Sequence, residues 1–215
     1  MQLPTFVRHR VNSIKDLSNH APNWGAEIDI RSNVNIPGEL HLSHDPWTLG
    51  DNFDLWLNAF VKLNISGPLI LNTKEDGLES ILIEKLQERK ITNYFFLDTT
   101  PPTLIKYAFG LNIRNFAIRV SQFENVENAL LFKDHVDWVW LDCFAGVPVD
   151  INILKPILLH FKVCIVSPEL QSCQLEDNYL KFLPLVQKAK LICTKSPNFW
   201  LNKMLDNNKS REVQY

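Results

Sequence analysis

The segment AEIDIR, residues 26–31, shows the pattern that decides the fold. It is a short β-rich segment in which apolar residues stand beside charged ones, and its last residue is charged. Seven more short runs, rich in β-branched and aromatic residues and mostly continuous rather than alternating, lie at residues 5–10, 69–74, 94–98, 116–120, 138–143, 163–167 and 191–194. Strands that are buried on both faces of a parallel sheet have this composition. We therefore expect eight buried strands.

Segments with the period of a helix lie between these runs. Apolar side chains share one face in residues 53–63, 78–86, 102–107, 126–132, 151–160 and 179–188. Asp51 and Asp150 stand where they can cap the helices that follow. Alternating strands and helices predict an α/β protein with a parallel sheet, and eight strands predict a single small (β/α)8 TIM barrel. An open doubly wound sheet is the alternative, although no glycine-rich phosphate loop follows any strand.

We expect one domain, with the barrel in residues 1–205 and a polar, frayed tail in residues 206–215. About 37 residues separate the second and third predicted strands, more than one helix needs. Within them, residues 38–45 (GELHLSHD) have the pattern of a short extra strand or hairpin arm. In a barrel this excursion would lie on the catalytic face.

Composition excludes several classes of protein. The net charge is −2 and no basic cluster occurs, so nucleic acid is not an expected partner. No apolar run approaches the ~20 residues of a transmembrane helix, and the first residues lack a signal-peptide core. The four cysteines show no metal-ligand spacing, and three lie in buried runs, as expected of reduced core thiols. We expect a cytoplasmic protein, and no pattern indicates its oligomeric state.

Polar side chains gather at the predicted carboxyl ends of the strands, the edge that carries the active site in such barrels. They are His9 and Arg10 on the first strand, Glu27, Asp29 and Arg31 on the second, Asn72 and Lys74 on the third, and Asp98, Arg119, Asp142 and Lys195 on later strands. Asp98 and Asp142 also precede predicted helices, and for these two we expect capping rather than a role in the site.

Glu27 and Asp29 form the most specific feature. Residues i and i+2 of a strand point to the same side, so both carboxylates would face the barrel interior. Two such charges repel each other unless they are neutralised, and a divalent cation such as Mg²⁺ or Ca²⁺ can neutralise both. Alternatively, one carboxylate pairs with Arg31 or Arg10 and no metal binds.

Two histidines are candidates for proton transfer. His9 and His44 each end a β-like run beside a charged residue, and imidazole transfers protons near neutral pH. Lys74 would point inward with Asn72 and could bind a phosphate oxygen as a point charge. Trp47 follows His44 closely and could form a wall of the pocket.

The order His9-Arg10, then Gly25-Ala26-Glu27-Ile28-Asp29, then His44-Asp45 resembles the glycerophosphodiester phosphodiesterase family of the phospholipase-C-like superfamily. The motifs cover roughly residues 7–75, and the third strand carries Asn72 where the family often has a glutamate. The resemblance implies a hydrolase of small phosphodiesters, with His9 and His44 as general acid and base. Glu27, Asp29 and Asn72 would bind Mg²⁺ or Ca²⁺, while Arg10, Lys74, Arg31 and Trp47 would bind substrate.

Two alternatives remain open. Asn72 contributes no charge to a metal site, so the barrel could bind a phosphorylated ligand without turning it over. The chain could also be an unrelated barrel enzyme, such as an isomerase or aldolase, in which Lys74 or Lys195 is the electrophilic or Schiff-base group.

Overall fold

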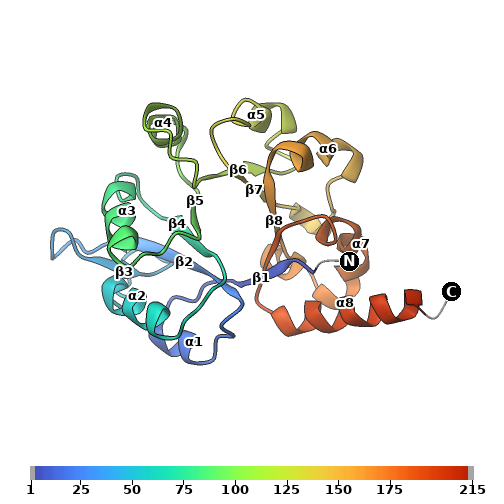
Figure 1. Ribbon diagram of the computed structural model, residues 1–215, viewed down its shortest axis with the longest axis horizontal. Helices are drawn as coiled ribbons and strands as arrows, with labels where there is room; N and C mark the ends of the chain where they lie inside the picture. The colour runs from blue at the N-terminus through green and yellow to red at the C-terminus, as the bar shows by residue number, and fades with distance from the viewer. Residues whose placement is uncertain (1–2, 213–215) are drawn as a thin grey trace.

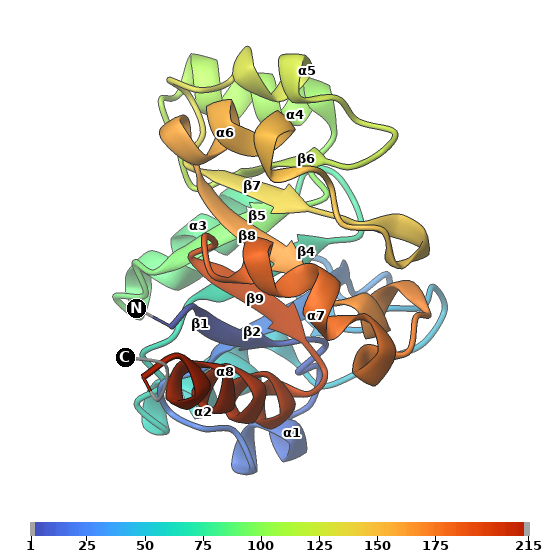
Figure 2. The ribbon, with the colours of Figure 1, turned by 90° about the vertical axis from the view of Figure 1, so that its right-hand side faces the viewer.

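The computed structural model describes residues 3–212, and its centre is a barrel of parallel strands (Figures 1 and 2). Eight parallel strands follow the order β5-β4-β2-β1-β9-β8-β7-β6. They are β1 (Thr5–Arg8), β2 (Gly25–Ser32), β4 (Leu69–Thr73), β5 (Tyr94–Leu97), β6 (Ala117–Val120), β7 (Trp138–Leu141), β8 (Lys162–Val166) and β9 (Leu191–Thr194). Each predicted strand overlaps one of these, so the prediction of a small (β/α)8 barrel is confirmed.

The barrel is least complete between β5 and β6. These strands meet through an isolated bridge between Phe96 and Phe116, where the Phe96 N–H donates to the Asn115 carbonyl at 2.8 Å. The Phe96 and Phe116 rings stack beside this bridge, with centroids 4.9 Å apart. Aromatic packing therefore helps to join the two edges where the ladder of hydrogen bonds is short.

Helices surround the strands. They are α1 (Ile14–Ser18), α2 (Phe53–Lys62), α3 (Glu79–Glu88), α4 (Pro101–Ile105), α5 (Val126–Leu130), α6 (Ile151–His160), α7 (Leu175–Val186) and α8 (Pro197–Glu212). A turn of π-helix, Lys106–Gly110, continues α4, and short 3-10 turns occupy Phe144–Gly146 and Pro168–Gln171. No helix among residues 3–212 combines the length and apolar character needed to cross a membrane.

Local details differ from the sequence-based expectations at two helices. Asp150 caps α6 as predicted, but Asn52 rather than Asp51 caps α2, its side chain accepting from the Leu55 N–H at 3.1 Å. Asp51 instead accepts from the Ile14 N–H at 2.7 Å and joins the start of α1 to α2. Helix α8 continues to residue 212, into the predicted polar tail, whose last three residues lie outside the described part.

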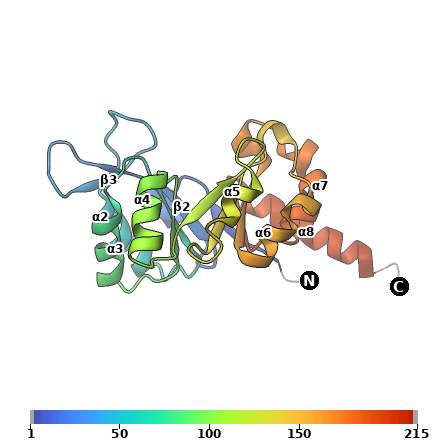
Figure 3. The same cartoon turned by 90° about the horizontal axis from the view of Figure 1, so that it is seen from above.

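The excursion between the second and third barrel strands contains β3 (Leu40–Leu42). This strand pairs antiparallel with the end of β2, with Arg31 opposite His41, which confirms the expected extra strand. The loops on either side of β3 project from the barrel (Figure 3). The second of them, between β3 and α2, carries His44 and Trp47.

Two apolar layers hold the barrel together. The outer layer lies between strands and helices and includes Ile28, Leu71 and Trp56. The inner layer fills the barrel and includes Val7, Ile70, Phe95 and Trp138, with the last two rings stacked at a centroid distance of 4.6 Å. This inner layer forms an apolar floor beneath the polar side chains at the carboxyl ends of the strands.

Candidate active site

A cavity of about 190 Å³ opens at the carboxyl ends of the barrel strands. Its walls include seven of the predicted site residues: His9, Arg10, Glu27, Asp29, His44, Asn72 and Lys74. Its other walls come from Leu97, Asp98, Arg119, Trp140, Asp142, Val166, Leu170 and Gln171. The sequence-predicted cluster therefore comes together in space, although its members span more than 60 residues of chain.

Glu27 lies at the centre of this cluster and is fully buried. Its carboxylate accepts from the Arg10 backbone N–H at 2.8 Å and from Asn72 Nδ2 at 3.1 Å. Burial, followed by the charge of Asp29, raises the pKa of Glu27 from 4.5 to about 7. The two hydrogen bonds oppose this shift without cancelling it. Glu27 therefore changes charge near neutral pH, unlike an ordinary glutamate.

Asp29 is equally buried but is surrounded by donors. Lys74 Nζ lies 2.9 Å from Oδ1, Asn12 Nδ2 donates to Oδ2 at 2.7 Å, and Arg10 Nε lies 3.8 Å from Oδ2. The Asp29 N–H also donates to Asn12 Oδ1 at 2.9 Å, so Asn12 holds both the backbone and the side chain. Asn12 was missed in the sequence because no motif or periodicity marks a single loop amide.

Asn72 places its side-chain amide beside both carboxylates. It stands opposite Asp29 in the β2–β4 register, and its Nδ2 is used by Glu27. Its buried Oδ1 has no hydrogen-bond partner within the described part of the chain. Residues 3–212 contain no group of three or more histidine, cysteine, aspartate or glutamate side chains placed to hold a metal ion. Any cation here would therefore depend on two carboxylates and this amide oxygen.

His9 follows β1, and its backbone N–H donates to the Thr194 carbonyl at 3.0 Å. Nε2 lies 3.7 Å from Glu27 Oε2, while the buried Nδ1 has no partner among the residues described. Burial, and then the positive charge of Arg10, lowers the pKa of His9 from 6.5 to about 4, although Asp29 opposes the shift. His9 is therefore a neutral imidazole at pH 7, able to accept a proton.

His44 lies across the cavity on the loop after β3 and is more exposed. Its Nδ1 lies 2.7 Å from Asp45 Oδ1, a contact that orients the ring. Arg31 holds this loop through a 3.0 Å hydrogen bond from its guanidinium to the His44 carbonyl. The two histidines thus have different surroundings: one is desolvated, and the other is paired with a carboxylate.

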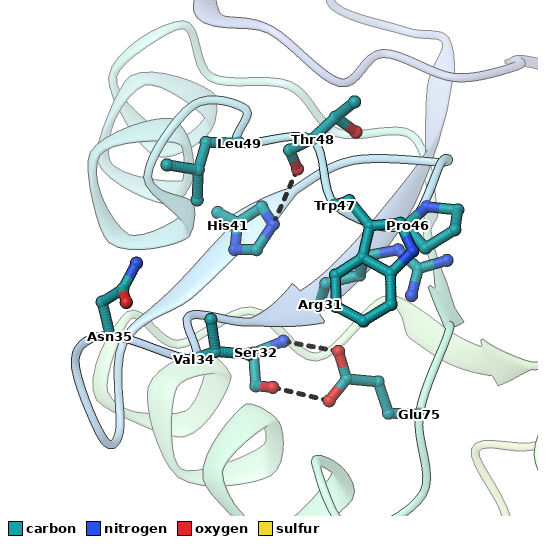
Figure 4. Close-up of a pocket in the computed structure, with 10 residues that line it drawn as sticks. All are labelled: Arg31, Ser32, Val34, Asn35, His41, Pro46, Trp47, Thr48, Leu49 and Glu75. Carbon is teal, nitrogen blue, oxygen red and sulfur yellow. Dashed lines mark hydrogen bonds between the residues drawn. The ribbon is translucent and has the colours of Figure 1, made fainter.

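Arg31 and Trp47, predicted to bind substrate, do not line this cavity. Both line an adjoining pocket, together with Pro46, Thr48 and Leu49 of the loop after β3 (Figure 4). Arg31 is two residues beyond Asp29 on β2, but the register with β4 ends at Ile30, and Arg31 pairs with His41 of β3. Trp47 is 96% exposed and lines that pocket from the solvent side of the loop after β3.

The expectation that Asp98 and Asp142 cap helices is wrong. Thr100 stands at the cap position of α4, while Asp98 and Asp142 both bind the guanidinium of Arg119. Gln171 adds a 2.6 Å hydrogen bond to Asp142. Charges at three strand ends were the available signal, but proximity to helices in sequence favoured the capping interpretation. Parallel strand ends meet in space, and this ion-pair network is the result.

The fold was compared with known proteins. No protein-family model matches the sequence, and no curated protein matches it significantly. A structure of an Oleispira antarctica phosphodiesterase in complex with the product sn-glycerol-3-phosphate is similar over 91% of this chain and 94% of its own, with a TM-score of 0.67 and 15% identity. The chain has the barrel fold of the glycerophosphodiester phosphodiesterase structures.

Two more such structures agree. A glycerophosphodiester phosphodiesterase from Parabacteroides distasonis is similar over 97% of this chain and all of its own, with a TM-score of 0.63 and 10% identity. One from Agrobacterium tumefaciens is similar over 89% of this chain and 96% of its own, with a TM-score of 0.57 and 9% identity. At these identities the likeness establishes the fold, and the chemistry must be argued from the side chains.

Proposed function

We propose that this barrel cleaves small phosphodiesters, with His9 and His44 as its acid–base pair. The observation that carries the proposal is the convergence of both histidines with Glu27, Asp29 and Lys74 on one cavity at the carboxyl ends of the strands. The bound sn-glycerol-3-phosphate of the Oleispira antarctica structure supports a small phosphorylated ligand. Cleavage of a phosphodiester needs proton transfer at both the attacking and the leaving oxygen, which two histidines can provide.

The surroundings of the two histidines support a different role for each. His9 is neutral at pH 7 because its pKa is lowered to about 4, so it would accept the proton of the attacking hydroxyl or water. His44, held by Asp45 at 2.7 Å, would donate a proton to the leaving oxygen. Lys74 and Arg10, both beside Asp29, would bind the phosphoryl oxygens.

The donor atoms around Glu27 fit a hard divalent cation. Glu27 and Asp29 offer carboxylate oxygens, and the unpartnered Asn72 Oδ1 offers a third ligand. Mg²⁺ and Ca²⁺ prefer such oxygens, so we propose that these three residues hold one of them. When bound, the cation would offset negative charge on the phosphoryl group. Burial, and then the charge of Asp29, raises the pKa of Glu27, and a bound cation would favour its ionised form.

The test is hydrolysis of glycerophosphodiesters and of bis(p-nitrophenyl) phosphate in the presence of Mg²⁺, Ca²⁺ or Mn²⁺. We expect turnover by the native chain, a large loss in His9→Ala and in His44→Ala, and a much smaller loss in Gln171→Ala, which alters the same cavity away from the histidines. Absence of turnover with every cation, or full activity in both histidine variants, would refute the proposal.

Asn72 favours one second candidate. Because an amide contributes no charge, the barrel could retain a phosphorylated ligand without cleaving it. Calorimetry would then show glycerol 3-phosphate or an intact diester binding, and the diester would be recovered unchanged after incubation with metal. Hydrolysis of the bound diester would exclude this candidate.

A further inference from the structure

A second pocket of about 490 Å³ lies beside the candidate active site. Its floor and walls come from the end of β2, from β3, from the loops on either side of β3 and from Glu75 after β4 (Figure 4). Four apolar side chains, Val34, Pro46, Trp47 and Leu49, contribute to the lining. Three of them are strongly exposed: Val34 at 84%, Trp47 at 96% and Leu49 at 72%. A volume of this size suits a small organic ligand rather than a single ion.

The pocket is not explained by packing within the chain. Apolar side chains that stay exposed on two neighbouring loops do not contribute the stabilisation that burial would give. Clusters of such side chains commonly mark binding sites. Trp47 also has a φ of 65°, a left-handed conformation that a bulky residue rarely adopts. The loop therefore holds a large apolar ring in solvent at a backbone position that does not favour it.

Polar atoms at the back of the pocket are only partly used. The Glu75 carboxylate accepts from the Ser32 backbone N–H at 3.0 Å and from its hydroxyl at 2.6 Å. His41 Nε2 lies 3.2 Å from the Thr48 carbonyl, but its buried Nδ1 has no partner in the portion of the chain described. The same is true of the buried Arg31 Nε. His41 is 7% exposed, so its ring is fixed within the wall.

The pocket and the candidate active site are joined by one loop. His44 lines the catalytic cavity, whereas Pro46 and Trp47, two and three residues later, line the second pocket. Arg31 lies in the second pocket and donates to the His44 carbonyl at 3.0 Å. A phosphodiester with its phosphate beside His44 could therefore extend one of its alcohol groups over the Arg31 side chain into the apolar pocket.

We propose that this pocket binds an alkyl chain carried by one alcohol of the phosphodiester. The inference rests on the proposed function and names its substrate class: a diester with one apolar alcohol. The aliphatic side chains of Val34, Pro46 and Leu49 in the lining match a flexible chain.

Calorimetry with alkyl phosphates tests the inference without turnover. Methyl, butyl and octyl phosphate differ only in the chain. We expect the Kd to fall about twofold for each added methylene, because an open pocket covers part of a chain whose complete burial is worth about fourfold per methylene. In the double variant Trp47→Ala/Leu49→Ser this dependence should disappear while methyl phosphate binds as before. Leu159→Ser, which removes an 80% exposed leucine on α6, is the matched control and should bind like the native chain.

Each outcome is decisive. Equal affinity for methyl and octyl phosphate, no binding of any alkyl phosphate, or an unchanged chain-length dependence in the double variant would overturn the inference. Tighter binding of phenyl phosphate than of octyl phosphate would replace the alkyl chain by an aromatic group. Hydrolysis of glycerophosphodiesters is measured separately, so a chain that cleaves them but shows no chain-length dependence refutes the inference and leaves the proposed function standing.

Discussion

The two sides of the barrel mouth contain similar residues in opposite states. On the side of β1, β2 and β4, Glu27 is fully buried with a raised pKa, and Asn72 Oδ1 and His9 Nδ1 lack partners among the residues described. On the side of β6 and β7, Arg119 binds the carboxylates of Asp98 and Asp142. On the first side these polar atoms stay unpartnered beside Asp29, which Lys74 and Asn12 pair, whereas on the second side the charges pair with one another.

The difference separates the two reasons for which polar groups are buried. A paired network stabilises a fold because each charge is compensated, and breaking one partner exposes the desolvation cost of the other. Unsatisfied groups destabilise the free protein and persist where a ligand completes them. We therefore expect changes on the first side to affect activity and ligand binding, and changes on the second to affect folding.

The largest effect expected is on turnover. His9→Ala should lower kcat about a thousandfold, since general acid–base catalysis contributes roughly 10²–10⁴. Gln171→Ala, on the paired side of the same cavity, should change kcat less than about tenfold, the equivalent of about 1.4 kcal/mol. Steady-state kinetics with a glycerophosphodiester measures both. Equal losses in the two variants would mean that the division between the sides does not extend to chemistry.

The next effect is on stability and falls on the paired side. Arg119→Gln leaves Asp142, whose side chain is 1% exposed, without its cationic partner. We expect the free energy of unfolding to drop by about 3 to 5 kcal/mol, as for other broken buried pairs. Lys74→Gln should cost less, because Asp29 keeps the Asn12 hydrogen bond at 2.7 Å and Arg10 at 3.8 Å. Urea unfolding measures both, and a larger loss in Lys74→Gln would reverse the comparison.

The third effect is on the pH dependence of stability, and it falls on the side of β1, β2 and β4. The folded pKa of Glu27 is about 7, raised from 4.5, so folding favours its protonated form. Its contribution is therefore complete below pH 4.5 and is lost as the pH rises through 7. At pH 8 and without divalent cations, Glu27→Gln should remove an ionisation penalty of about 3 kcal/mol, leaving a net gain of about 1 to 2 after weakened hydrogen bonds.

Unfolding of Glu27→Gln at two pH values checks the sign. The variant should be more stable than the native chain at pH 8 and no more stable at pH 4.5. Asp98→Asn, on the paired side, should lose stability at pH 8, since it removes a partner of Arg119. A Glu27→Gln variant that is less stable at pH 8 than at pH 4.5, relative to the native chain, would show that Glu27 is compensated in the free protein.

The sequence predicted the barrel because hydrophobic runs and helical periods are local signals that survive without contacts. It also predicted that Glu27 and Asp29 share a face, since strand geometry alone decides that. It did not predict the ion-pair and hydrogen-bond partners of the charged side chains. Arg119 with Asp98 and Asp142, and Asn12 with Asp29, join residues 17 to 23 positions apart across a barrel that only closure creates. Arg31 lies outside the cavity because the end of β2 pairs with β3. This pairing is a tertiary contact, and no local sequence signal at Arg31 predicts it.

The smallest effect compares one substitution, amide to carboxylate, on the two sides. Asn72→Asp would give the cation a third carboxylate and should tighten Mg²⁺ or Ca²⁺ binding about tenfold at pH 8, the equivalent of about 1.4 kcal/mol. Gln171→Glu adds the same charge beside Asp142, on the other side of the barrel mouth. It should leave the Kd of the cation unchanged within about twofold, because Asp142 already binds Arg119 there.

Isothermal calorimetry measures both constants, and the pH separates metal binding from simple charge. The added carboxylate of Asn72→Asp lies beside Glu27 and should raise the pKa of Glu27 further, so protons compete more strongly at pH 6. The tenfold gain should therefore shrink as the pH falls from 8 to 6. A gain that is equal in both variants would indicate general attraction by charge, and no gain at pH 8 in Asn72→Asp would contradict a metal site built on Glu27, Asp29 and Asn72.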